Sequence, residues 1–134
     1  MSWDVYVTKF EKEYMSPEDI PDNSQPVSLG TRIALRNAIS TVFPDTVWDK
    51  ELTWGTWEGS DGSVEFNLGD DEPVSFMLHV RANESVIPKI IKLIRENKWQ
   101  AIDCSDNTFL EKATRPEDGL SNWRAYKDDI LEKP

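Results

Sequence analysis

The dipeptide Asp61-Gly62 restricts the fold of this chain more than any other feature, because it separates two segments of β character, 52–59 and 63–69. Asp-Gly favours a two-residue type I′ turn, which needs positive φ at both positions and joins antiparallel strands. A third segment of the same character, 72–82, follows directly. The sequence therefore predicts a hairpin extended by a third strand.

Apolar residues alternate with polar ones along these segments and along residues 2–10, which is the period of a half-buried strand. Three of these strands, over residues 2–10, 63–69 and 72–82, have clear inward faces. Their inward residues are Trp3, Val5, Val7, Val64, Phe66, Leu68, Phe76, Leu78 and Val80. Each of these strands therefore has one face for the core and one face for other contacts.

Two segments have helical periodicity. Ser28 is predicted to cap a helix that runs to about Phe43, with its apolar stripe at positions i, i+3, i+4 and i+7. Asn83 or Ser85 is predicted to cap a second helix whose buried stripe is Ile87, Ile90, Ile91 and Ile94. A strand within 99–105 and a C-terminal helix over 119–132, capped by Ser121, complete the pattern.

The predicted order is β-α-β-β-β-α-β followed by the C-terminal helix, with a proline-containing loop over 11–27. Consecutive strands, with too few helices to cover two faces, predict an α+β fold. We expect a two-layer sandwich with a mostly antiparallel or mixed sheet of about five strands and helices on one face. The 134 residues fit a single globular domain, 1–134.

The chain is acidic, with 15 Lys and Arg against 25 Asp and Glu and a net charge of −10. This charge repels phosphate backbones, so nucleic acid is not a predicted partner, and it favours a basic protein. The sequence shows no secretion signal and no apolar run long enough for a bilayer span, so no membrane association is predicted. With Cys104 as the single cysteine, a cytoplasmic location is expected, and Cys104 itself is predicted to be a buried thiol within a strand.

No cofactor and no metal are predicted. His79 and Cys104 are the chain's only histidine and cysteine, and a zinc site needs three or four converging ligands. The acids Asp70, Asp71 and Glu72 lack the ligand spacing of a calcium loop, so we interpret them as a solvated turn. His79 lies farther along the returning strand, away from that turn.

The face of the sheet turned away from the helices carries the candidate binding surface, and pairing Trp57 with Phe66 places Glu58 opposite Glu65. The predicted surface residues are Tyr6, Trp54, Glu58, Glu65, Asn67, Met77, His79 and Arg81. An aromatic residue and a methionine among charges resemble the composition of protein interfaces. The 11–27 loop or the C-terminal helix could instead cover this face.

Three functions fit these features. The favoured one is a non-enzymatic cytosolic module that binds a basic protein through acidic and aromatic surface. The first alternative is a small hydrolase or ligand-binding enzyme that uses His79 with Glu58 or Glu65, since opposed carboxylates have split pKa values. The second is a homodimer joined through the open sheet face.

Five segments carry a resemblance: WDVYVTKF, LGTR, VFPDTVW, EFNLGDDEPVSFMLHVR and WQAIDCSDNTFLE. Over residues 2–111 the chain resembles a family of small, acidic, cytosolic bacterial proteins, with EFNLGDDEP and FMLHVR as the most specific elements. No activity attaches to that family, so the resemblance implies no catalytic residues. In size, charge and fold class the chain is also similar to bacterial immunity proteins that neutralise a basic toxin.

Overall fold

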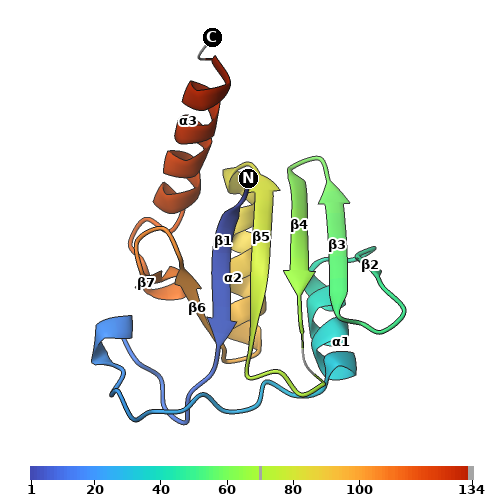
Figure 1. Ribbon diagram of the computed structural model, residues 1–134, viewed down its shortest axis with the longest axis vertical. Helices are drawn as coiled ribbons and strands as arrows, with labels where there is room; N and C mark the ends of the chain where they lie inside the picture. Colours follow the sequence, from blue (N-terminus) through green and yellow to red (C-terminus); the bar gives the residue numbers. More distant parts are fainter. Residues whose placement is uncertain (70, 133–134) are drawn as a thin grey trace.

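An antiparallel sheet in the order β2-β3-β4-β5-β1-β6-β7 forms the centre of the computed structural model, which describes residues 1–69 and 71–132 (Figure 1). The strands are β1 (Trp3–Thr8), β2 (Val47–Trp48), β3 (Trp54–Gly59), β4 (Gly62–Asn67), β5 (Ser75–Ala82), β6 (Gln100–Asp103) and β7 (Thr108–Phe109). The α+β class and the helices on one face are confirmed. Asp70 lies outside the described residues.

The sheet of the described residues has seven strands, whereas the sequence predicted about five. The two additional strands, β2 and β7, are each two residues long and form the two edges. A two-residue strand is too short to show a period of two, which is why the sequence pattern missed both. Short edge strands also limit pairing with another chain.

Helices α1 (Arg32–Val42) and α2 (Ile87–Glu96) cover one face of the sheet (Figure 1). The N-cap of α1 is Thr31, whose Oγ1 accepts a hydrogen bond of 3.1 Å from Ala34 N. Ser28, the predicted cap, instead accepts from Gly30 N within the preceding turn. The helix therefore begins later than predicted, because the local Ser28 turn competes with helical hydrogen bonding.

Asn83 caps a short 3-10 turn, η2 (Glu84–Val86), by accepting from Ser85 N, and α2 follows at once. The buried side chains of α2 are Ile87, Ile90, Leu93 and Ile94. Ile91, predicted in the buried stripe, is only partly buried and lies at the side of the helix. Leu93 takes its place on the face that meets the sheet.

The core fills the space between the helices and the sheet, and aromatic rings occupy much of it. Phe43, at the end of α1, packs edge-on against Trp57 and Phe66 with ring centroids 5.3 Å apart in each pair. Phe43 and Phe66 are completely buried. Edge-to-face geometry adds to the stabilisation from burial.

The β3–β4 hairpin has the predicted faces but a different register. Gly59 pairs with Gly62, so Ser60 and Asp61 form the turn rather than Asp61 and Gly62. Positive φ occurs at Gly62, at +127°, where a side chain would overlap the backbone of Arg81 and Ala82. Glu58 is consequently opposite Ser63, and the predicted Glu58–Glu65 pair is wrong.

The C-terminal helix α3 (Asp118–Glu132) begins one residue before the predicted start and projects beyond the end of the sheet (Figure 1). Ser121, the predicted cap, lies inside the helix and donates to Glu84 Oε1 at 3.0 Å. Arg124 pairs with the other oxygen of the same carboxylate. Leu120 is fully buried, so the first turn of α3 is the part attached to the core.

Cys104 is exposed and lies just after β6, which ends at Asp103. The prediction of a buried thiol within a strand is therefore wrong. The strand ends because the Asp103 carboxylate accepts from Ser105 N at 2.9 Å and starts a turn. Burial, followed by the charges of Asp4 and Asp103, raises the pKa of the Cys104 thiol, which lowers its reactivity.

Candidate functional site

The sheet face opposite α1 and α2 brings the eight predicted surface residues onto one side in three rows. One row contains Trp54, Asn67, Met77 and Tyr6, joined by successive strand pairing. The next row contains Glu65 and His79, and the third contains Glu58 and Arg81 across β3, β4 and β5. We call this set, together with Asp4, the open face.

His79 is at the centre of the open face. Its Nδ1 lies 2.9 Å from Asp4 Oδ1, and its ring stacks on Trp54 with centroids 6.0 Å apart and an interplanar angle of 22°. Asp4 and Glu65 are the strand-pairing neighbours of His79 on its two sides. Two carboxylates and an indole therefore surround the imidazole, and hydrogen bonding to Asp4 fixes the orientation of its ring.

Arg81 and Glu65 form an ion pair of 3.3 Å, and Arg81 Nε also donates to the backbone oxygen of Met1. Glu58 is exposed and forms no ion pair with any described residue. Three carboxylates, Asp4, Glu58 and Glu65, therefore share the face with one arginine and one histidine. The open face is acidic on balance when His79 is neutral.

The 11–27 loop covers only one end of this side of the sheet. Gln100 exchanges two hydrogen bonds with the backbone of Tyr14, of 3.1 and 2.8 Å, which fixes the loop over the start of β6. Thr8 and Gln100 are buried there, with 1% and 3% of their surface exposed. Trp54, by contrast, is 37% exposed.

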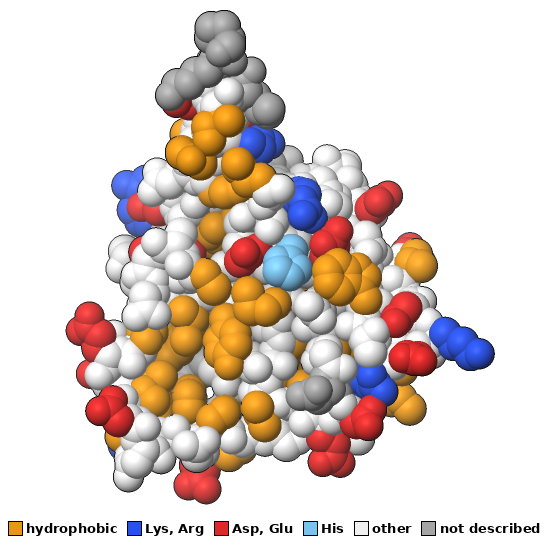
Figure 2. Space-filling model, in the orientation of Figure 1, with side chains coloured by type: hydrophobic (Ala, Val, Ile, Leu, Met, Phe, Trp, Pro, Cys, Tyr) orange, Lys and Arg blue, Asp and Glu red, His pale blue; other side chains and the backbone are white. Residues whose placement is uncertain are grey.

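Figure 2 shows this side of the molecule, with the single histidine near its centre. Acidic side chains flank the histidine and apolar side chains adjoin it, while α3 extends away beyond the sheet. Neither the loop nor α3 therefore closes the central part of the open face. The indole and the carboxylates are accessible from solvent.

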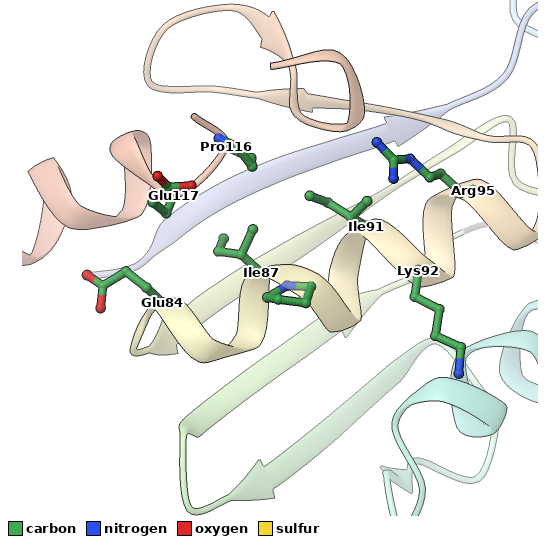
Figure 3. Close-up of a pocket in the computed structure, with 8 residues that line it drawn as sticks. Glu84, Ile87, Ile91, Lys92, Arg95, Pro116 and Glu117 are labelled. Atoms are coloured by element: carbon green, nitrogen blue, oxygen red, sulfur yellow. The ribbon is translucent and has the colours of Figure 1, made fainter. Parts of the chain in front are cut away.

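A separate cavity of about 510 Å³ lies between α2 and the segment before α3 (Figure 3). Ile87, Pro88 and Ile91 form its apolar wall, and charged side chains from both segments surround it. Glu84 lines its end, where a hydrogen bond from its own backbone amide, and then its contact with Arg124, lower the pKa of the carboxyl. Sequence periodicity did not find this cavity, since it had assigned Ile91 to the buried stripe.

Asp4 is the residue of the open face that the sequence reasoning left out. The sequence pattern could have placed it there, because Asp4 alternates with Trp3 and Val5 and so shares a face with Tyr6. Among the described residues, no group of three or more His, Cys, Asp or Glu side chains is arranged to hold a metal ion. The acidic turn before β5 does not approach His79 in any contact of the described chain, and Asp71 instead pairs with Arg32.

No protein-family model, no curated protein and no solved structure matches the chain. Within 1–69 and 71–132, no helix has the length and apolar character needed to cross a membrane. The candidate site therefore has to be interpreted from its own geometry.

Proposed function

We propose that the chain is a cytosolic, immunity-like binding module that engages a basic protein through the open face. The observation that supports this best is the exposed Trp54 ring, which stacks on His79. His79 itself lies between the carboxylates of Asp4 and Glu65. An indole face attracts a lysine or arginine side chain, and adjacent carboxylates add charge-assisted hydrogen bonds. The net charge of −10 would guide a basic partner toward the chain.

The partner contact would centre on Trp54. An arginine or lysine of the partner would lie over the free side of the indole, within reach of Glu65 and of Glu58, which has no ion pair of its own among the described residues. Aromatic anchors surrounded by polar groups carry most of the binding energy in many interfaces. Replacing Trp54 should therefore weaken binding far more than replacing an acid elsewhere on the surface.

Affinity capture from lysate of the native host, at low and raised salt, tests the proposal. We expect the wild type to retain a basic protein at low salt and less of it at raised salt, because charge-driven association is screened. Trp54→Ala and Glu65→Gln should lose that protein, whereas Glu72→Gln, on the acidic turn, should retain it. Recovery of no protein partner under either condition would contradict the proposal.

The hydrolase alternative has one supporting observation, the 2.9 Å contact between Asp4 and His79. The described register removes the Glu58–Glu65 pair on which part of it depended, and His79 does not line the cavity beside α2. The homodimer alternative uses the same open face, so sedimentation distinguishes it. A dimer that Trp54→Ala converts to a monomer would favour self-association over a basic partner.

A further inference from the structure

A second cavity, of about 520 Å³, lies between the end of β1, the C-terminal end of α2 and the short turn η3 (Leu110–Lys112). Phe10 and Trp99 contribute aromatic wall, and Trp99 is held edge-on against Phe76 in the core. Ligand cavities in proteins are commonly of this size and are mostly lined by apolar side chains. The residues of the open face do not line this cavity, so it is a separate site.

The cavity is basic although the chain is acidic. Five of the chain's 15 Lys and Arg line it, against three carboxylates, so it carries 5 − 3 = +2 while the chain carries −10. The five cations are Lys9, Lys12, Arg95, Lys98 and Lys112. Lys112 pairs with Glu13, and Lys12 lies over the Tyr14 ring. Among the described residues, Lys9 and Lys98 form no side-chain hydrogen bond or ion pair, so both are free for a ligand.

Glu111 gives the cavity its second unusual feature. Its side chain is buried, with 9% of the residue exposed; Oε2 accepts from Ala101 N at 3.1 Å, but Oε1 has no hydrogen-bond partner among the described residues. Arg95 extends from α2 toward this segment (Figure 3), yet its Nη2 donates to the backbone oxygen of Glu111 and not to the carboxylate. A buried polar atom without a partner is costly, and a ligand that supplies a donor removes that cost.

We infer that this cavity binds a small organic acid with an apolar body and a hydrogen-bond donor, such as a 2-hydroxy acid with an aromatic side chain. The carboxylate of the ligand would contact Lys9 and Lys98, and its body would lie against Phe10 and Trp99. Its donor group would reach Glu111 Oε1. A single negative charge suits the site better than a phosphate dianion, because the cavity already contains a buried carboxyl group and has a surplus of only two cations.

Titration of the ¹⁵N-labelled full chain with 3-phenyllactate, followed by NMR, tests the inference. We expect saturable shifts that include the Trp99 indole N–H. 3-Phenylpropionate, which lacks the hydroxyl donor, should bind about tenfold more weakly, because one charge-assisted hydrogen bond is lost. 2-Phenylethanol, which lacks the carboxylate, should cause no saturable shift. Phenyl phosphate should bind more weakly than 3-phenyllactate, and tighter binding would overturn the assignment to a carboxylate.

Variants locate the contacts. Lys9→Gln and Lys98→Asn should each weaken 3-phenyllactate binding about tenfold, and Asn is chosen because residue 98 has φ of +57°, which asparagine tolerates. Lys50→Gln, outside the cavity, is the matched control and should bind like the wild type. Glu111→Gln should abolish the preference for 3-phenyllactate over 3-phenylpropionate. Ala101 N would keep the amide oxygen at the Oε2 position, so the amide NH2 would occupy the Oε1 position and could not accept from the ligand hydroxyl.

Two results would overturn the inference: no saturable shift with 3-phenyllactate at millimolar concentration, or shifts that persist unchanged in both lysine variants. The lysine variants keep the test valid if Glu111→Gln does not fold. Because the open face contributes no residue to this cavity, Trp54→Ala should bind 3-phenyllactate normally. A negative result with 3-phenyllactate would therefore not bear on the proposed protein-binding function. Likewise, failure to capture a protein partner would not bear on ligand binding in this cavity.

Discussion

Gly119, at the second position of α3, lies against the buried carboxylate of Asp103. Adding a methyl group there, as in Gly119→Ala, should push the start of the helix away from the sheet. A Cβ at position 119 would overlap Asp103 Oδ2 and lie 2.9 Å from Asp103 Cγ and 3.1 Å from Ser105 Oγ. Asp103 cannot turn aside freely, because its Oδ1 accepts from Trp3 Nε1 at 2.9 Å and from both the backbone and the hydroxyl of Ser105. Gly119→Ala must therefore break these bonds or displace the start of α3.

Both outcomes are costly. Leaving the buried Trp3 N–H without an acceptor costs about 1–3 kcal/mol. Moving the helix instead exposes Leu120, now fully buried, at roughly 1.5–3 kcal/mol. The gain in helix propensity from Gly to Ala offsets at most about 1 kcal/mol. We expect a net loss of about 1–2 kcal/mol in the free energy of unfolding.

Urea denaturation followed by tryptophan fluorescence measures this loss, which should lower the midpoint by about 0.5–1 M for a chain of this size. The steric reasoning also requires coupling: in an Asp103→Ala background, Gly119→Ala should lose most of its cost, because the overlapped atom is gone. A Gly119→Ala midpoint equal to that of the wild type would refute the reasoning. So would equal costs in the two backgrounds.

Three further perturbations test other parts of the fold. Burial raises the pKa of Glu111 above its ordinary 4.5, so the stabilising contribution of this carboxyl group is complete below pH 4.5 and is lost as the pH rises through the folded-state pKa. Urea titrations should therefore find Glu111→Gln more stable than the wild type at pH 7 and equal to it at pH 4. Arg124→Ala should raise the pKa of Glu84 only part of the way to 4.5 in a carboxyl NMR titration, because the amide hydrogen bond, the larger cause of the lowered pKa, remains; a full return would assign the shift to Arg124. Gly62→Ala should cost about 2–3 kcal/mol in urea denaturation, from positive φ plus backbone overlap, whereas the control Gly69→Ala, with φ of +70° and no atom within 4 Å, should cost about 1; equal losses would rule out the overlap.

Alternation placed the open face correctly even though the hairpin register was wrong. Moving a two-residue turn back by one residue shifts each cross-strand pair by two, and a shift of two keeps every side chain on its own face. Glu65 therefore lost Glu58 as its predicted partner and has Thr56 and His79 beside it, without leaving the open face. Face assignment depends only on parity, whereas register depends on where the turn lies, and here Gly62, with its positive φ, follows the turn instead of forming part of it.

Features that depend on tertiary packing could not be predicted in this way. The first cavity needs residues 116–117 to meet α2, and the second needs residues 9–13 to meet the end of α2 and η3, contacts that no local periodicity encodes. The exposure of Cys104 depends on the Asp103 side chain, which ends β6 through its bond to Ser105 N. The apolar pattern alone predicted that the strand runs through Cys104. In the sequence, an aspartate that ends a strand cannot be told from one that points outward within it, and Asp103 is the former.

The position of β1 between β5 and β6 has a consequence for the order in which a nascent chain can fold. Residues 3–8 are synthesised before either partner, and the last of those partners ends at Asp103. One edge of β1 can pair once β5 has been made, but its other edge stays unpaired until β6 follows about twenty residues later. Contacts of such sequence separation slow folding and leave aggregation-prone surface exposed in the meantime. This part of the sheet is completed in a late step, when β6 docks on a strand that was made before both of its partners.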